Sequence, residues 1–493
     1  MPNEPTKSRR SFDKAFSAAL LLALVLSALL SGPLCAAPAK PNFIVIFVDN
    51  LGNGDLQCFN PATPHRTPHI DRLAAEGTKF TSFYVSSGVC TPSRASMMTG
   101  CYPRRVNLHV SDKNAPVLQP VAAKGLNPDE TTLAEVLKPA GYATACIGKW
   151  HLGDQPPFLP TRQGFDEFFG LPYSDDMTRD VRPDKWPDLP LMRGERVIEA
   201  PANRDLLVKR CTEETIAFIE RNRARPFFIY LPHTMPGSTA HPFSSPAFRG
   251  KSRNGDYGDS VEELDWSTGE IVAALRRLKL DTNTLIVWTA DNGAVRRNPL
   301  QGSCAPYKGF GYDTSEGAMR VPCVMWWPGR IPAGRVCTDL VSTMDLLPTF
   351  ARLASVPPPA RPVDGHDIRP LLFAETGAKS PWDAKGFAYY EMEQLQAIRA
   401  GEWKLYLPLT NKFTSLGRKT APVKLQLFDV LRDVSEAREV SAQHPDVVQR
   451  LLGLADAVRA DIGDMGRPGS GQRPAGWVEN PRPITPAAAT PRP

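Results

Sequence analysis

Three apolar runs rich in β-branched residues constrain the fold of this chain most strongly. They are PNFIVIFVD at 41–49, FFIYLPH at 227–233 and TLIVWTADNG at 284–293. Continuous apolar runs of this kind predict parallel strands that are buried on both faces. Between the last two runs, residues 257–278 have apolar side chains at helical spacing, as expected of a crossover helix. The order strand, helix, strand therefore predicts an α/β fold built on a mostly parallel sheet.

Oxygen-bearing side chains stand at the ends of two of these runs. Asp49 and Asn50 end the first, and Asp291 and Asn292 end the third. In open α/β sheets, ligands gather at the carboxyl edge of the strands. One such pair alone would indicate a turn or a helix cap. Two pairs favour a site for a hard divalent cation, calcium or magnesium rather than zinc.

The pattern changes near residue 387. Short strand candidates follow one another (FAYYEM, LQAIRAG, EWKLYLP and KLQLFDV), and residues 444–463 read as a helix. This order predicts a smaller C-terminal antiparallel sheet with a packed helix. The expected organisation is a catalytic domain over 38–385, a C-terminal α+β subdomain over 386–466, and a disordered tail rich in proline over 467–493.

Residues 1–37 resemble an export signal. Lys7, Arg9, Arg10 and Lys14 precede the apolar run AALLLALVLSALL, and small residues follow at 35–37. The run is short for a membrane span, so no stable membrane insertion is expected after signal removal. The paired arginines suit twin-arginine export and the apolar core suits the general secretory route, which leaves both open. The mature protein is expected to be exported, either periplasmic or secreted.

Composition excludes some classes of function. The chain has 493 residues, 42% of them hydrophobic, enough for one large core and a smaller one. Its net charge of +6 is spread along the sequence, which argues against a nucleic-acid partner but suits an anionic substrate. The nine cysteines show neither a zinc pattern nor a regular disulfide framework. Most are expected to be small buried apolar residues.

The stretch CTPSRASMMTG, from Cys90 to Gly100, combines a reactive side chain with a helix start. Pro92 suits a first helical position and Gly100 suits the position after a helix end, so a short helix is expected over 92–99. The free N–H groups and the positive dipole end of such a helix favour a tetrahedral anion, either sulfate or phosphate. Arg94, one turn along, would add a positive charge.

This stretch resembles the signature of the formylglycine-dependent sulfatases, which are arylsulfatase-like members of the alkaline phosphatase superfamily. The resemblance extends over about residues 42–463 and implies an alkaline-phosphatase-like sheet sandwiched by helices. It also implies that a maturation enzyme oxidises Cys90 to formylglycine, whose hydrated aldehyde is the nucleophile. The same resemblance implies that Asp49, Asn50, Asp291, Asn292 and the modified Cys90 surround one divalent cation, usually Ca²⁺. Asn50 stands where relatives commonly have a second aspartate, which should weaken the site.

A second motif, GYATACIGKWHLG at 141–153, resembles another segment of the family. It implies that Lys149 binds sulfate and that His151 takes a proton from the aldehyde hydrate, a general-base role that suits imidazole. Ser174, in GLPYSDDM, resembles the family's hydroxyl donor to sulfate. Taken alone, these residues would be read as a solvated surface pair and a turn serine.

The leaving-group side departs from the family pattern. Gly237 follows Pro236 in PHTMPGSTAHPF, so His241 is the first candidate for protonating the leaving oxygen and His233 is the second. Either could instead be a structural histidine. The lysine that relatives place on sulfate falls at Gly311, and Lys308 is the nearest substitute. These departures indicate altered specificity or weakened activity.

The expected function is hydrolysis of an aryl sulfate or a sulfated carbohydrate, small or polymeric, by an exported sulfuric ester hydrolase. One alternative is a phosphonate or phosphodiester hydrolase of the same superfamily, because a phosphate group is also a tetrahedral anion. Another is a catalytically silent binder of sulfated glycans, which the departures at Asn50 and Gly311 suggest.

Overall fold

The computed structural model describes residues 40–414 and 421–486, and the chain from Pro41 onward forms one compact unit. The export signal expected at 1–37 lies outside the described residues. Within the described residues, no helix has both the length and the apolar character needed to cross a membrane.

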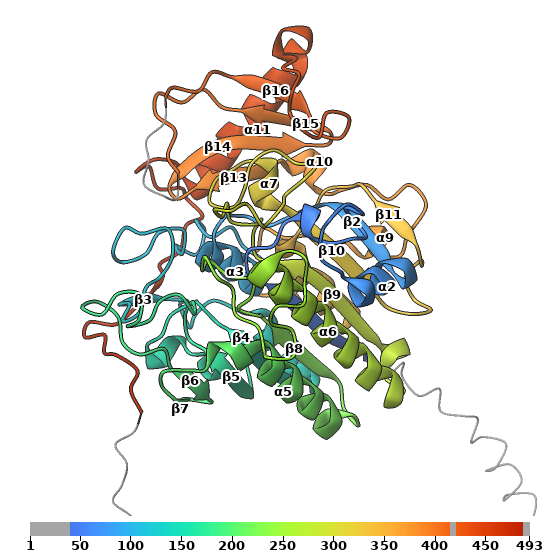
Figure 1. Ribbon diagram of the computed structural model, residues 1–493. Helices are drawn as coiled ribbons and strands as arrows, with labels where there is room; N and C mark the ends of the chain where they lie inside the picture. Colours follow the sequence, from blue (N-terminus) through green and yellow to red (C-terminus); the bar gives the residue numbers. More distant parts are fainter. Residues whose placement is uncertain (1–39, 415–420, 487–493) are drawn as a thin grey trace, which may run out of the picture. The chain divides into compact units, whose positions relative to one another are not determined.

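The core of the described chain is an eleven-stranded sheet in the order β11-β2-β10-β9-β1-β8-β4-β5-β6-β7, with β12 paired to β2 (Figure 1). The middle strands β9, β1, β8, β4 and β5 run parallel, whereas β10, β6 and β7 pair antiparallel with their neighbours. The strands are β1 (Asn42–Val48), β2 (Thr78–Tyr84), β4 (Ala143–Lys149), β5 (Glu167–Leu171), β6 (Leu191–Arg193), β7 (Arg196–Glu199), β8 (Phe227–Leu231), β9 (Thr284–Ala290), β10 (Arg320–Trp326), β11 (Arg335–Cys337) and β12 (Val341–Ser342).

The three apolar runs form the adjacent central strands β8, β1 and β9, as expected. Every residue of these strands is buried, because helices cover both faces of a parallel sheet. Strand β1 lies between the other two, and its register pairs Val48 with Ala290 of β9. The residues that follow, Asp49 and Asp291, therefore leave the sheet side by side.

Helices pack on both faces of this sheet. Helix α5 contacts β4 and β8 and lies beside the crossover helix α6, while the ring of Phe350 in α8 stacks on Phe43 of β1 (Figure 1). The helices are α2 (Pro68–Glu76), α3 (Cys90–Thr99), α4 (Leu133–Leu137), α5 (Leu207–Asn222), α6 (Gly255–Arg277), α7 (Glu316–Met319), α8 (Leu346–Leu353), α9 (Arg369–Leu372), α10 (Trp382–Lys385) and α11 (Pro445–Ile462).

The C-terminal region folds as expected into a four-stranded antiparallel sheet with a packed helix. Its strands are β13 (Phe387–Glu391), β14 (Gln394–Ala400), β15 (Trp403–Tyr406) and β16 (Gln426–Asp429), and α11 contacts β14 and β15. The fold class predicted from the sequence is therefore confirmed: a mostly parallel sheet between helices, with a smaller antiparallel sheet after it.

The tail expected to be disordered is ordered over 467–486. Within it, β17 (Gly476–Trp477) pairs antiparallel with β3 (Lys124–Gly125). Arg473 donates to both carboxylate oxygens of Glu130 at 2.8 Å. Composition predicted disorder here because it does not record specific contacts between distant residues. Contacts of this kind hold residues 467–486 against the domain of the large sheet.

Candidate active site

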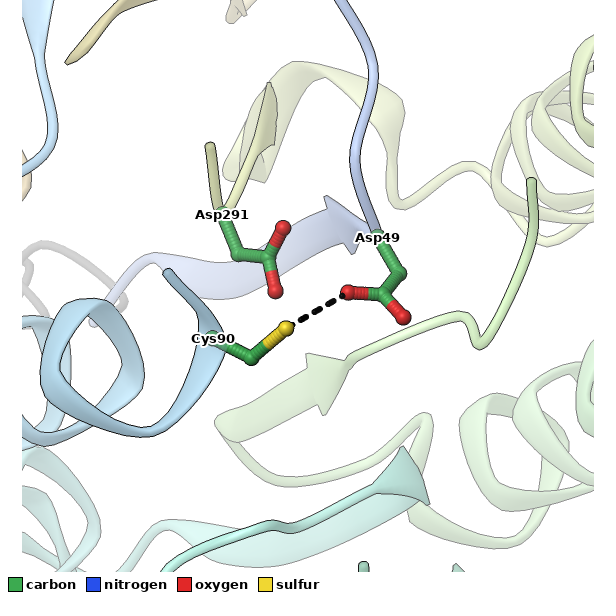
Figure 2. A group of neighbouring side chains, drawn as sticks. All are labelled: Asp49, Cys90 and Asp291. Atoms are coloured by element: carbon green, nitrogen blue, oxygen red, sulfur yellow. Dashed lines mark hydrogen bonds between the residues drawn. The ribbon is translucent and has the colours of Figure 1, made fainter. Parts of the chain in front are cut away.

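The site forms where the carboxyl ends of β1 and β9 meet the start of α3. Asp49 and Asp291 leave neighbouring strands, and the thiol of Cys90 points between them (Figure 2). Cys90 Sγ donates to Asp49 Oδ1 at 3.3 Å. One ligand atom from each of the three residues lies within 4.8 Å of the others, and all three are buried.

Helix α3 begins at Cys90, two residues before the expected start at Pro92. The reactive residue is therefore itself the first residue of the helix. The helix ends as expected, because Gly100 takes a left-handed conformation with φ of 68° and donates its N–H to Ser96 O. The side chain of Cys90 thus lies at the positive end of the helix dipole.

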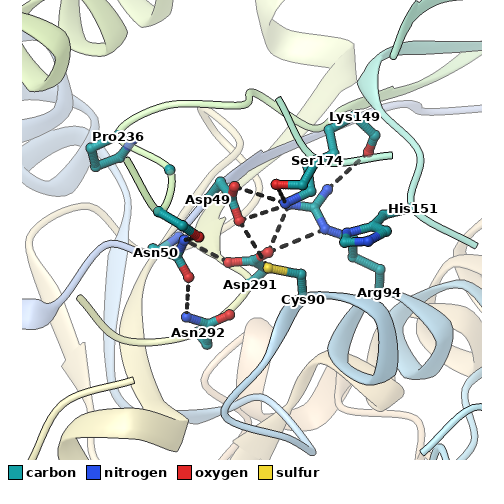
Figure 3. A network of polar contacts seen from close by, with 12 residues as sticks. Asp49, Asn50, Cys90, Arg94, Lys149, His151, Ser174, Pro236, Asp291 and Asn292 are labelled. Carbon is teal, nitrogen blue, oxygen red and sulfur yellow. Dashed lines mark hydrogen bonds and ion pairs between the residues drawn. The ribbon is translucent and has the colours of Figure 1, made fainter. Parts of the chain in front are cut away.

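Arg94 and Lys149 bring two positive charges to the two carboxylates (Figure 3). Arg94 donates to Asp291 Oδ2 through Nη2 at 2.7 Å and Nε at 3.1 Å, and its Nη1 donates to Lys149 O at 2.9 Å. Lys149 Nζ donates to Asp49 Oδ2 at 2.8 Å and to Ser174 Oγ at 3.0 Å. The structure thus brings Lys149 and Ser174 into direct contact beside Asp49.

These charges control the ionisation of the site. Burial alone raises the pKa of Asp49, but the charges of Lys149 and Arg94 outweigh it and hold that pKa below its usual range. Burial and the charge of Asp49 raise the pKa of Asp291 to about 7. Burial and Asp49 also raise the pKa of the Cys90 thiol, which makes the unmodified side chain a poor nucleophile.

The two asparagines form a second layer beside the carboxylates. The backbone N–H of Asn50 donates to Asp291 Oδ1 at 2.9 Å, and Asn50 takes a left-handed conformation with φ of 62°. Its side chain accepts from Asn292 Nδ2 at 2.5 Å and donates to Ser238 Oγ at 3.1 Å. An aspartate at position 50 could not make that last donation, so the amide has a use here that the family's usual carboxylate would not have.

His151 lies next to the nucleophile with one ring nitrogen free. Its Nε2 donates to Leu118 O at 2.9 Å, and its backbone carbonyl accepts from Thr91 Oγ1 at 3.1 Å. Its Nδ1 is buried and has no hydrogen-bond partner among the described residues. Burial and the charge of Lys149 lower the pKa of His151 well below its ordinary value. The ring is therefore neutral, with an available lone pair on Nδ1.

Neither histidine expected on the leaving-group side joins this cluster. The side chain of His241 is 86% exposed, and its Nδ1 lies 2.9 Å from Asp256 Oδ2. His233 is buried, but its Nε2 contacts Ser267 Oγ of α6 at 3.2 Å. The sequence prediction for His241 is thus corrected, because the chain turns outward after Gly237 before it reaches His241.

Lys308 does not substitute for the lysine that is missing at Gly311. Lys308 is exposed. The pKa of Asp433 is lowered mainly by a hydrogen bond from the backbone N–H of Arg438, and the nearby charge of Lys308 makes a smaller contribution. Gly311 lies tight against the site: a Cβ there would come within 2.6 Å of Gly293 O and 3.1 Å of Asn292 Nδ2. The path of this loop therefore leaves no room for a lysine at position 311.

Three residues that the sequence did not predict contact the edge of the site. Ser238 Oγ and Tyr312 OH share a hydrogen bond of 2.7 Å, which joins the segment after β8 to the segment before α7. Arg297 donates to Gly237 O at 2.5 Å and to Thr239 O at 3.2 Å. Ser238 and Tyr312 each directly follow a departure from the family pattern, Gly237 and Gly311, whereas Arg297 had no such signal.

The site is closed in this structure. Asp49, Asp291, Arg94 and Lys149 are fully buried, and Cys90 is 4% exposed. The contact between Ser238 and Tyr312 joins two loop segments at the edge of this buried site.

The donor set fits a divalent cation that prefers oxygen ligands. Asp49 and Asp291 offer carboxylates, and Asn292 Oδ1 is buried with no hydrogen-bond partner among the described residues. The charges of Asp49 and Asp291 are matched by those of Arg94 and Lys149, so an anionic ester bound here would add an unmatched buried charge. A divalent cation on the carboxylates would balance it.

Comparisons with known proteins agree with this geometry. Residues 41–356 match the sulfatase family model, and residues 308–453 match the C-terminal region of N-sulphoglucosamine sulphohydrolase. The chain is 34% identical to mouse (Mus musculus) steryl-sulfatase, over 91% of this chain and 86% of that protein. It is 36% identical to human (Homo sapiens) arylsulfatase A, over 87% and 89%. N-acetylgalactosamine-6-sulfatase of Sus scrofa is 38% identical, over 78% and 75%.

Solved structures show the same relationship. The PsFucS1 sulfatase of Pseudoalteromonas sp. matches with a TM-score of 0.75 and 27% identity, over 85% of this chain and 89% of that one. A phosphonate monoester hydrolase of Agrobacterium radiobacter matches with a TM-score of 0.55 at 18% identity, over 85% and 95%, which shows a shared fold alone. With the family model covering most of the chain and sulfatases among its relatives, this protein belongs to the sulfatase family and is a sulfuric ester hydrolase.

Proposed function

We propose that this protein is an exported sulfatase that hydrolyses aryl or carbohydrate sulfate esters with formylglycine at position 90 and a divalent cation. The observation that carries the proposal is the position of Cys90, at the first turn of α3 between Asp49 and Asp291. A hydrated aldehyde there supplies an oxygen nucleophile, which the buried protonated thiol does not.

Each surrounding side chain has a role in this proposal. Arg94 and Lys149 hold the sulfuryl oxygens and the nucleophile, and Ser174, bonded to Lys149 Nζ, donates to the sulfate. His151 would accept, at its unpartnered Nδ1, the proton of the hydrate's remaining hydroxyl, so that the aldehyde forms again as the C–O bond to the transferred sulfate breaks. Leu118 O fixes the tautomer through Nε2.

Asp49, Asn50, Asp291 and Asn292, with position 90, would hold the cation. A bound Ca²⁺, or Mg²⁺ as the alternative, supplies positive charge to the sulfuryl oxygens. Because neither His241 nor His233 joins the cluster, the leaving group of a sugar ester would receive its proton from another donor. An aryl oxide leaves readily without one, whereas a sugar alkoxide depends more strongly on such a donor.

Mass measurement of the peptide that contains residue 90 tests the nucleophile. In protein from its native source, conversion should lower the peptide mass by the difference between a thiol side chain and an aldehyde. Cys90→Ala should abolish sulfate release from 4-nitrophenyl sulfate while the melting temperature changes little, because a small side chain is replaced by a smaller one. Full activity with unmodified Cys90 would refute the proposal.

Parallel assays separate the alternatives. Sulfate release that exceeds phosphate release from matched 4-nitrophenyl esters supports a sulfatase, and the reverse preference supports a phosphonate or phosphodiester hydrolase. Fully converted protein that binds sulfated glycans without releasing sulfate would be a silent binder. The proposal also includes a formylglycine-generating enzyme as a maturation partner and a periplasmic or secreted location.

A further inference from the structure

Asp175 is a buried carboxyl that the proposed reaction does not use. It directly follows Ser174 and is fully buried. Neither of its carboxyl oxygens has a hydrogen-bond partner among the described residues. Burying such a group without a donor is costly, so buried carboxyls in folded proteins nearly always have one. A donor from outside the described chain, either a water molecule or a ligand, would satisfy these oxygens.

The carboxyl of Asp175 lies close to Gly237 and Asp49. A Cβ at Gly237 would lie 2.8 Å from Thr234 O, 3.4 Å from Asp175 Oδ1 and 3.9 Å from Asp49 Oδ2. Gly237 also donates its N–H to Asp49 O at 3.0 Å. Ser174, the residue before Asp175, accepts from Lys149 Nζ at 3.0 Å, so Asp175 adjoins the residues that would hold an ester's sulfate.

Charges of both signs lie around Asp175. Burial, followed by the charge of Asp176, raises the pKa of Asp175 to about 7, while Lys149 and Arg204 act in the opposite direction. Asp176, the next residue, also has a buried oxygen without a partner among the described residues. Arg204 is close, but its guanidinium donates to the backbone carbonyl of Asp175 at 3.4 Å and pairs with Asp180 at 3.1 Å. Lys149 is bonded to Asp49 and Ser174. Two neighbouring acidic groups can accept hydrogen bonds from a ligand and will repel an anion.

Building on the proposed function, we propose that Asp175 determines specificity by accepting a hydrogen bond from a hydroxyl or amide N–H of the group that carries the sulfate. The preferred substrate class is then a sulfate ester of a neutral sugar. Esters of sugars that carry a carboxylate are disfavoured by the charges of Asp175 and Asp176. An aryl sulfate without hydroxyl groups gains nothing from Asp175.

The test compares wild type with Asp175→Asn in converted enzyme. Galactose 6-sulfate and N-acetylgalactosamine 6-sulfate are the neutral probes, glucuronic acid 2-sulfate is the acidic probe, and 4-nitrophenyl sulfate reports the basal reaction. Asp175→Asn should lower kcat/KM for a neutral sugar sulfate at least ~10-fold more than for 4-nitrophenyl sulfate, chiefly through KM. Asp175→Asn should also lower the ratio of kcat/KM for the neutral sugar sulfates to kcat/KM for the acidic one. Asp180→Asn, on an exposed carboxylate that pairs with Arg204, should change neither ratio.

Three results would overturn the assignment. One is an equal effect of Asp175→Asn on sugar and aryl substrates. Another is a wild type that cleaves 4-nitrophenyl sulfate but neither neutral sugar sulfate. The last is a calorimetric Kd for galactose 6-sulfate that is the same for unconverted Asp175→Asn protein as for unconverted wild type. Asp176→Asn, on a partly exposed residue, provides a second variant and should show a smaller effect of the same kind. Loss of 4-nitrophenyl sulfate cleavage in wild type, with binding that depends on Asp175, would refute the sulfatase reaction alone.

Discussion

At the scale of single residues, the hydrogen bond that His151 makes through Nε2 determines which ring nitrogen can accept a proton. Nε2 donates to Leu118 O, so Nδ1 carries the lone pair. Desolvation favours the neutral ring, and the positive charges of Lys149 and Arg94 add to that effect. A base with a strongly lowered pKa is a weak base, but it remains unprotonated and available at mildly acidic pH.

The protonation of His151 can be followed directly. Because its pKa lies well below the usual value of about 6.5, its imidazole NMR signals should not shift between pH 8 and pH 6. The signals are assigned by their absence in His151→Gln, which should also lower kcat on 4-nitrophenyl sulfate by roughly 10²- to 10⁴-fold. A titration of these signals near pH 6.5 would contradict the buried, neutral ring.

At the scale of elements, a buried ion pair fastens the C-terminal sheet to the loop that leads into α7. Lys404 Nζ of β15 lies 2.9 Å from Glu316 Oε1 of α7 and donates to Thr314 O at 3.2 Å, and both charged side chains are fully buried. Tyr389 of β13 also donates to Glu316 at 3.0 Å. This network holds the segment that carries Tyr312, so the small sheet helps to shape the edge of the site.

Glu316→Gln should destabilise the fold by about 3–5 kcal/mol, because it removes a buried carboxylate that contacts Lys404 at 2.9 Å and Arg320 at 3.5 Å. Lys404 would keep only the longer of its carboxylate contacts, that with Glu436 at 3.5 Å. Urea unfolding at pH 7 measures the loss. Burial alone raises the pKa of Glu316, but Lys404 outweighs it and the pKa falls to about 2. The depressed pKa means that the ionised pair stabilises the fold above about pH 4.5 and that this contribution disappears as the pH falls toward 2.

The difference between wild type and Glu316→Gln should therefore shrink at pH 3. The control combines Glu316→Gln with Lys404→Met and Glu436→Gln, because Glu436 also pairs with Lys404 at 3.5 Å. It removes all three charges and should recover part of the lost stability. A triple variant less stable than the single one, or a difference that does not change with pH, would show that the buried ion pairs are not the source of the effect.

At the scale of the whole molecule, residues 467–486 return from the C-terminal region to the domain of the large sheet. Arg473 binds Glu130 through two nitrogens, and Arg473 Nη1 donates to Pro362 O at 2.9 Å. Further along, the backbone N–H of Val478 donates to Ala123 O at 2.8 Å. The end of the chain thereby connects parts that are hundreds of residues apart in sequence.

Arg473→Ala should lower the free energy of unfolding by about 1–3 kcal/mol, because the buried carboxylate of Glu130 loses its bidentate partner. Arg361→Ala is the matched control, since Arg361 contacts the same carboxylate at 3.3 Å. The side chain of Arg361 is 41% exposed, whereas that of Arg473 is 15% exposed. The control should cost less than about 1 kcal/mol. If Arg473→Ala and Arg361→Ala lowered the free energy of unfolding equally, the contact between Arg473 and Glu130 would contribute no more to stability than the exposed contact of Arg361.

The sequence by itself determined the central strands, the cation-type residues at their ends and the helix at Cys90. Such features are local: an apolar run reports burial on both faces, and the carboxyl ends of parallel strands meet at one edge whatever joins them. Asp49 and Asp291 could therefore be placed together without coordinates. The roles of Lys149 and His151 came only from the resemblance to a family motif, because a Lys-x-His pair taken alone indicates a solvated surface.

Only the tertiary structure decided which side chains complete the site around the leaving group. His241 and Lys308 were the substitutes that the sequence offered where it departs from the family pattern, yet the first is exposed and the second lies near Asp433. The path of each loop depends on contacts between distant residues, such as Arg297 with Gly237 O and Tyr312 with Ser238. A local pattern carries no record of such contacts. For the same physical reason, the ordered tail and the unpartnered carboxyl of Asp175 became visible only once the chain was folded.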